Sequence, residues 1–199
     1  MLVTDCEMTG LEPHLHSILS VGVIDLEHPE RQLYEECRMW DGAKVEDEAL
    51  AVCGFTREQI ADPTKQTEGE LVHKFIAFAN GMQDTTLAGQ NVFVDFFFLQ
   101  AAAKRAGHTA WPFAHRIIDL HSLCWEHKIK GGEAPPLDAE KHHSALNLEA
   151  VCNYVGIPKE TKPHNALTGA KVSAEAISRL LYDKKLLPEF EQYQIPWLS

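Results

Sequence analysis

Residues 1–13 read MLVTDCEMTGLEP, a short predicted strand over residues 1–4 that runs into two acids and then a turn. Alternate side chains share one face of an extended backbone, so Asp5 and Glu7 are expected to lie side by side. Two neighbouring carboxylates are costly to bury without a partner, and a divalent cation would remove that cost. The segment therefore predicts a cation-binding strand end. The alternative is that both acids are simply solvated.

Hydrophobic periodicity and turn residues predict the remaining elements. The predicted strands cover residues 1–4, 17–26, 32–40, 86–89 and 116–119. The predicted helices cover residues 47–52, 68–80, 94–106, 120–127, 147–155 and 166–181, with one more short helix opened by Thr56. Strands that come first, followed by strands that alternate with helices, predict one α/β domain with a mixed sheet.

The length of 199 residues favours a single domain. We expect this domain to occupy residues 1–185, and residues 186–199 to form a C-terminal extension that packs on the domain or on a partner chain. Residues 128–142 contain two glycines and two prolines, and they are expected to form an exposed loop.

The composition excludes several classes of protein. With 45% hydrophobic and 24% charged residues the chain is neither disordered nor collagen-like. A net charge of −11 argues against a protein that coats nucleic acid through bulk charge, although it does not exclude a nuclease. Five cysteines without a CxxC pair favour a reducing compartment, so we expect a cytoplasmic protein. No secretory signal or membrane span is expected, because the longest apolar run, residues 92–99, is short and contains Asp95.

Two further polar groups lie in unusual surroundings. Asp95 occurs within the apolar segment GQNVFVDFFFL (residues 89–99), where the alternative role is that of a helix N-cap. His164 precedes the start of the last predicted helix, where a histidine alone is more often a surface or capping residue.

Together these three groups resemble the motifs of the DEDDh (DnaQ-like) 3′–5′ exonucleases. That family includes the proofreading ε subunit of bacterial DNA polymerase III, RNase T and oligoribonuclease. The matching motifs are DCE at residues 5–7, NVFVD at residues 91–95 and HNA at residues 164–166, in the family's order. The resemblance covers about residues 2–182. It implies a ribonuclease H-like fold, with a mixed five-stranded sheet flanked by helices.

One position departs from the family pattern. The third motif has the form H-x-A-x-x-D-A, and Gly169 stands where the fourth acid is expected. The chain is therefore either an impaired or inactive member, or it carries a substitution at a ligand. Glu175 is six residues further along the helix and is expected to point well away from residue 169, so we do not take it as a replacement.

The resemblance implies a two-metal phosphodiesterase that uses Mg²⁺ or Mn²⁺. Asp5 would bridge both ions, Glu7 would hold the first and Asp95 the second. His164 would take the proton from the attacking water, since the unperturbed pKa of histidine, about 6.5, suits a base near neutral pH. The implied contacts to the terminal nucleotide come from the turn after the first strand and from the second motif: Met8, Thr9, Gly10, Leu11, Asn91 and Phe98. Leu11 and Phe98 could instead be plain core residues.

The implied function is hydrolysis of single-stranded DNA or RNA from the 3′ end, with release of nucleoside 5′-monophosphates. The choice between DNA and RNA stays open. An alternative function is an impaired exonuclease-fold module that binds nucleic acid or a protein partner. RNase T and oligoribonuclease imply a homodimer, and the ε subunit implies a polymerase partner.

Overall fold

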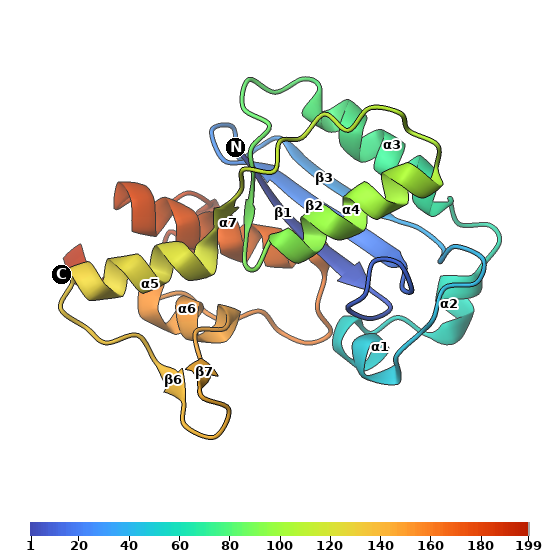
Figure 1. The fold of residues 1–199 in the computed structure, drawn as a ribbon. Coiled ribbons are helices and arrows are strands. Elements are labelled where there is room, and N and C mark those ends of the chain that lie inside the picture. The colour runs from blue at the N-terminus through green and yellow to red at the C-terminus, as the bar shows by residue number, and fades with distance from the viewer. Residues whose placement is uncertain (199) are drawn as a thin grey trace.

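The computed structural model describes residues 1–198 and contains a five-stranded sheet in the order β3-β2-β1-β4-β5 (Figure 1). The strands β1 (Leu2–Met8), β2 (Ile18–Asp25) and β3 (Gln32–Glu36) form an antiparallel meander. The short strands β4 (Leu87–Gly89) and β5 (Ile118–Asp119) extend the sheet in parallel from β1. The predicted α/β fold with a mixed sheet is confirmed.

The central strand β1 is longer than predicted. It continues to Met8, so both Asp5 and Glu7 are strand residues rather than the residues that follow a strand. Its partner β2 is buried at all eight positions, as its β-branched run predicts. The pairing shifts register between Glu7 and Met8, and this irregularity begins the turn after the strand.

Helices cover both faces of the sheet. The helices α3 (Glu68–Ala79) and α4 (Phe93–Arg105) pack on one face through a core that includes Phe75 and Leu99. The helices α5 (Leu120–Lys130), α6 (Leu148–Val155) and α7 (Ala166–Tyr182) form the other layer, where α7 lies against β1 and β2. The short helices α1 (Asp47–Cys53) and α2 (Arg57–Ala61) lie at the end of the sheet where β1 terminates (Figure 1).

The prediction of an exposed loop over residues 128–142 is confirmed for the exposure of most of the segment but is wrong about its secondary structure. Helix α5 continues to Lys130. The strands β6 (Leu137–Asp138) and β7 (His143–Ser144) then form a small hairpin that projects from the domain (Figure 1). The Asp138 carboxylate accepts hydrogen bonds from the backbone N–H groups of Glu140 and Lys141, which closes the hairpin turn.

The C-terminal segment packs on its own domain. It forms two 3₁₀ turns, η1 (Pro188–Phe190) and η2 (Pro196–Leu198). Buried Arg179 donates to the carbonyl oxygens of Phe190, Tyr193 and Gln194 and pairs with Glu175 at 2.7 Å. In residues 1–198 no helix is long and apolar enough to cross a membrane.

Candidate active site

The site is built on a close approach between β2 and α7. A Cβ atom on Gly22 would collide with the backbone of Ala166, so only glycine lets the start of α7 lie directly on the strand. Gly22 is paired with Asp5 across the sheet. The first turns of α7 therefore lie over the Asp5 side chain.

Gly169 faces Asp5 at this contact. A Cβ atom on Gly169 would lie 2.9 Å from Asp5 Cγ and closer still to Oδ2. The structure thus places residue 169 beside the first predicted acid, where the motif pattern expects a carboxylate. In this chain the Asp5 carboxylate itself fills the space that a side chain at residue 169 would take.

Asp95 comes from the opposite face of the sheet. It lies in the first turn of α4, whose N-cap is Val92, so the alternative role of Asp95 as an N-cap is wrong. Its side chain is 4% exposed, and its carboxylate accepts hydrogen bonds from the backbone N–H and the thiol of Cys6. Asp95 is therefore fixed against β1, one residue from both Asp5 and Glu7.

A fourth acid, Glu160, joins these residues, and the sequence motifs do not indicate it. It lies in the loop between α6 and α7, and its side chain is only 6% exposed. Oε1 accepts a hydrogen bond from the backbone N–H of Asn165 at 2.9 Å, and Oε2 lies 3.7 Å from Nδ1 of His164. The loop thus brings a carboxylate and the predicted base to the same side of α7.

Burial raises the pKa of all four carboxylates, and the charges of neighbouring acids add to the effect at Asp5 and Glu7. Burial raises the pKa of Asp5 well above its usual value, and the charges of Asp95, Glu7 and Glu160 raise it further. Burial followed by the charges of Glu160 and Asp95 raises the pKa of Glu7 to about 8. Burial also raises the pKa values of Asp95 and Glu160. No lysine or arginine forms an ion pair with any of the four within residues 1–198.

This donor set fits a hard divalent cation. Mg²⁺ and Mn²⁺ prefer carboxylate oxygens, and a cation would offset the repulsion that raises these pKa values. In the described part of the chain, no three His, Cys, Asp or Glu side chains already stand grouped as the ligands of one ion. The metal ligands Asp5, Glu7 and Asp95 therefore stay a prediction.

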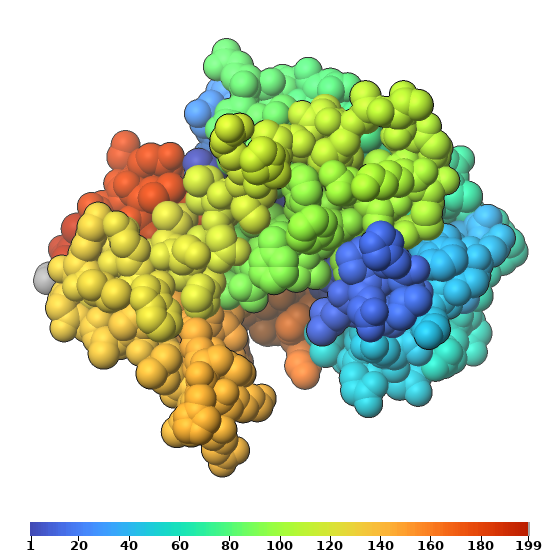
Figure 2. All heavy atoms as spheres, viewed as in Figure 1, coloured from blue at the N-terminus to red at the C-terminus, as the bar shows by residue number. Residues whose placement is uncertain are grey.

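A hollow of about 300 Å³ adjoins the carboxylate cluster at Glu7. Its walls come from the end of β1, the turn that follows it and α1, and they include Glu7, Met8, Gly10, Leu11, Ala49 and Val52. In Figure 2 the blue turn after β1 lies against the cyan segment that contains α1, and these two elements form the walls of the hollow. A mostly apolar hollow beside acidic groups suits a base and sugar whose phosphate lies at the acids.

The turn that carries Leu11 is braced from inside. The Thr9 hydroxyl donates to the Lys44 carbonyl at 2.7 Å and accepts from the Ser17 N–H at 2.9 Å. Thr9 is fully buried, so its side chain offers no surface to a nucleotide. The structure therefore does not support the predicted contact from Thr9. Leu11 at the tip is 73% exposed, and the alternative that it is a core residue is wrong.

The aromatic residues of α4 are distributed differently from the prediction. Phe98 is fully buried in the core, so it offers no surface to a nucleotide. Phe93 and Phe97 are about half exposed, at 49% and 52%, and lie one turn apart. Asn91 is exposed and takes a left-handed conformation (φ 51°) just before the helix. Phe93, Phe97 and Asn91 are therefore the groups of this segment that a ligand can reach.

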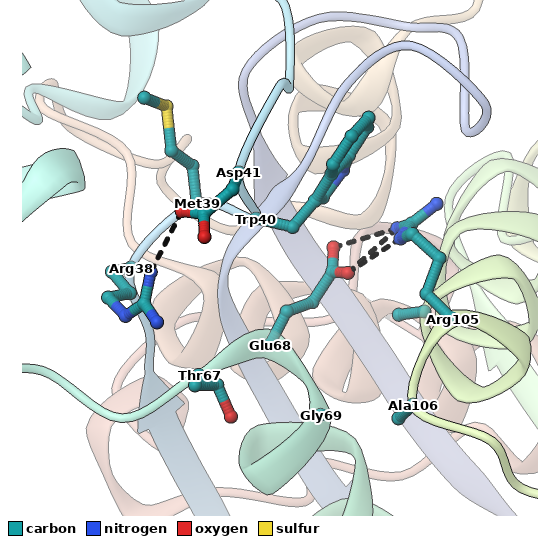
Figure 3. A pocket seen from close by; sticks show the side chains of 10 residues that line it. Arg38, Met39, Trp40, Asp41, Thr67, Glu68, Gly69, Arg105 and Ala106 are labelled. Carbon is teal, nitrogen blue, oxygen red and sulfur yellow. Dashed lines mark hydrogen bonds and ion pairs between the residues drawn. The ribbon is translucent and has the colours of Figure 1, made fainter.

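A second hollow, of about 270 Å³, lies away from the acids, between α3, α4 and the chain after β3 (Figure 3). There the Glu68 carboxylate accepts from the Arg105 guanidinium at 2.9 Å and also from the Ile18 N–H at 3.0 Å. The Trp40 ring covers the guanidinium at 5.1 Å. Since Glu68 is fully partnered, this cluster serves to join α3, α4 and β2.

The family model described as exonuclease (RNase_T) matches residues 2–177. Among solved structures, the nuclease domain of 3′hExo, a DEDDh family member bound to rAMP, has a TM-score of 0.68 at 18% identity, with 94% of this chain and 93% of that chain covered. E. coli exonuclease I in complex with a dA16 oligonucleotide has a TM-score of 0.69 at 18% identity, with 92% and 40% covered. This chain thus spans about 40% of the length of exonuclease I.

Cell-death related nuclease 4 has a TM-score of 0.70 at 12% identity, with 98% of this chain and 65% of that chain covered. No curated protein sequence matches the chain. At these identities the structures share the fold, while the family model carries the assignment.

Proposed function

Because this chain belongs to the exonuclease family whose model spans residues 2–177, we propose that it hydrolyses phosphodiester bonds at the 3′ end of single-stranded DNA or RNA and releases nucleoside 5′-monophosphates. The observation that carries the proposal is the position of Glu7. This residue lies both among the carboxylates and in the wall of the apolar hollow. A nucleotide in the hollow would therefore present its phosphate to the acids.

Asp5, Glu7 and Asp95 would hold two Mg²⁺ or Mn²⁺ ions. When bound, such ions supply a hydroxide nucleophile near neutral pH and offset the charge of the phosphate. The protein's own part is to hold these carboxylates close together in spite of their repulsion, through the strand β1 and the hydrogen bonds from Cys6 to Asp95.

His164 would take the proton of the attacking water. Its side chain is 35% exposed, and Nδ1 faces Glu160 at 3.7 Å. We propose that Nε2 accepts the proton, since Nδ1 is turned toward the carboxylate. The backbone N–H of His164 donates to the Val52 carbonyl at 3.0 Å, which fixes the histidine to α1 and the wall of the hollow.

The terminal nucleotide would lie against Met8, Gly10 and Leu11, with Asn91 at the start of α4. The exonuclease I structures solved with dA16 and dT13 oligonucleotides support a single-stranded substrate. Phe93 and Phe97 add exposed aromatic surface on which a second base could stack.

Gly169 favours a second candidate, a nucleic-acid-binding module with little or no turnover. Water can fill a ligand position but brings no negative charge. We therefore propose weak activity with Mg²⁺, which demands near-ideal octahedral geometry, and partial rescue by Mn²⁺.

Turnover of single-stranded oligonucleotides separates the two candidates. DNA and RNA of one sequence, labelled at the 5′ end, are incubated with Mn²⁺ and either the unaltered chain or Asp5→Ala. Stepwise shortening from the 3′ end by the unaltered chain alone supports the exonuclease. Tight binding of both strands without shortening would reject it in favour of the binding module.

Three further predictions concern the whole protein. The division at residues 185 and 186, the cytoplasmic location and the homodimer or polymerase partner stay proposals. Light scattering of the purified chain would identify a homodimer directly.

A further inference from the structure

The carboxylate that residue 169 lacks has a substitute nearby. Glu175 is not that substitute, because it is fully buried in an ion pair with Arg179 and accepts from the N–H groups of Leu186 and Leu187. Glu160 is different, since its charge acts on both Asp5 and Glu7 and no lysine or arginine neutralises it in residues 1–198.

Hydrogen bonds to one residue, Asn165, connect Glu160 to residue 169. The backbone N–H of Asn165, the N-cap of α7, donates to Glu160 Oε1 at 2.9 Å. The carbonyl oxygen of the same residue accepts from the Gly169 N–H at 2.9 Å. The position of the glutamate is thus tied to the first turn of α7, the turn that lies over Asp5.

We propose that Glu160 supplies, from the loop before α7, the carboxylate that residue 169 lacks, and that it holds the divalent cation together with Asp5 and Glu7. This inference rests on the proposed function, because it concerns the same site. Oε1 is occupied by the Asn165 N–H, which leaves Oε2 as the oxygen for the ion.

The arrangement explains why the site retains four acids although the third motif holds only a histidine. A carboxylate fixed by a backbone N–H loses little side-chain freedom on binding an ion. Because Asp5 already fills the space beside Gly169, the fourth carboxylate has to come from another direction, and Glu160 approaches from the loop.

The first test is calorimetric titration of Mn²⁺ alone into the full chain and Glu160→Gln. Glutamine keeps an oxygen for the Asn165 N–H, so the loop should stay folded. We expect Mn²⁺ affinity to fall at least about tenfold, the lower end of the loss typical of changes around metal sites. Glu149→Gln is the matched control, since Glu149 is an exposed glutamate that pairs with Lys159 in the same region. The Mn²⁺ affinity of this variant should equal that of the unaltered chain.

Asp5→Ala separates failure of this inference from failure of the proposed function. If Asp5→Ala loses Mn²⁺ binding while Glu160→Gln binds as tightly as the unaltered chain, the role of Glu160 is overturned and the exonuclease site stands. If Asp5→Ala also binds normally, the metal site itself is rejected.

The double variant Gly169→Asp/Glu160→Gln tests the substitution directly. If Glu160 stands in for an acid at residue 169, the new aspartate should restore the Mn²⁺ affinity that Glu160→Gln lost. The gain from Gly169→Asp should then be larger in the Glu160→Gln background than in the unaltered chain. Equal gains in both backgrounds would show that the two positions act independently and would overturn the proposal.

Glu160 could instead only orient His164. In that case Glu160→Gln would lower kcat and shift its pH profile while Mn²⁺ affinity stayed unchanged. That pattern overturns the ligand role.

Discussion

The Asp5 carboxylate occupies the space in which the side chain of residue 169 would begin, so the two positions compete for one volume. An added Cβ at Gly169 lies 2.9 Å from Asp5 Cγ, closer than real contacts allow. The Asp5 carboxylate ends a short side chain that can rotate. Any residue larger than glycine at position 169 forces that rotation. The absence of a side chain at residue 169 and the orientation of the Asp5 carboxylate are therefore one structural feature.

Gly169→Asp and Gly169→Ala should have opposite effects on activity. Both displace the Asp5 carboxylate, but only aspartate places a carboxylate at residue 169. Gly169→Asp should raise the Mg²⁺-dependent rate at least about tenfold, by the scale of changes around metal ligands. Gly169→Ala should lower the rate below that of the unaltered chain. Initial rates on a labelled single strand measure both, and a similar rise in both variants would mean that only the rotation of Asp5 matters.

His164→Ala should separate turnover from binding. Loss of a positioned acid–base group costs roughly 10²–10⁴ in rate. The affinities for Mn²⁺ and for single-stranded oligonucleotides should stay nearly unchanged, because His164 is not among the expected ligands. The rate is best measured in a Gly169→Asp background, where the starting activity is expected to be higher. A large loss of affinity with the rate intact would reject the role of base.

Folding stability should depend on pH through Glu7. Its pKa is raised from the usual 4.5 to about 8 in the folded chain, so between these values the folded state holds more protons than the unfolded state. Without metal, the stability that Glu7 contributes should therefore be fully present below about pH 4.5 and be lost as pH rises through about 8. Added Mn²⁺ should raise the melting temperature more at about pH 8 than at about pH 5, by at least about 2 °C.

The control for this pH dependence is Glu7→Gln. Without metal, this variant should lose less stability between the two pH values than the unaltered chain. Equal stabilisation by Mn²⁺ at both pH values would contradict an ion held by Glu7.

Leu11→Ala should weaken substrate binding without changing stability. Leu11 is mostly exposed at the tip of a braced turn, so its truncation leaves no cavity. Burying a leucine side chain against a base contributes about 1.5–3 kcal/mol, so KM should rise roughly tenfold or more while kcat changes little. Leu181→Ala, at an exposed position near the end of α7, is the control. An unchanged KM would place the terminal base elsewhere.

The sequence allows much of the fold to be predicted because the strands and long helices have strong hydrophobic patterns. Residues 18–25 are β-branched and apolar at most positions, and such a run has little alternative to a buried strand. The family motifs indicate Asp5, Glu7 and Asp95 because their order along the chain is characteristic.

The remaining site residues depend on tertiary structure. Glu160 lies between Lys159 and Lys162, and a charged segment of that kind is typical of a solvated turn. Only the packing of the loop between α6 and α7 turns it inward. Phe98 follows two other phenylalanines, and the phase of α4 decides that Phe97 is exposed while Phe98 is buried. A run of identical residues carries no information about that phase.

The contact of Gly22 with α7 makes the geometry of the site tolerant of substitutions along α7 but sensitive to a substitution at residue 22. Backbone atoms, rather than side chains, set the spacing between β2 and the start of α7. We therefore expect substitutions of apolar residues further along α7, such as Ile177 and Leu180, to leave the distance between Asp5 and residue 169 unchanged. A single methyl group at residue 22, in contrast, would collide with the backbone of Ala166 and move α7 away from β2 and from Asp5. Gly22 carries no functional group, yet a substitution there would disrupt the proposed active site, because its strand neighbour is Asp5.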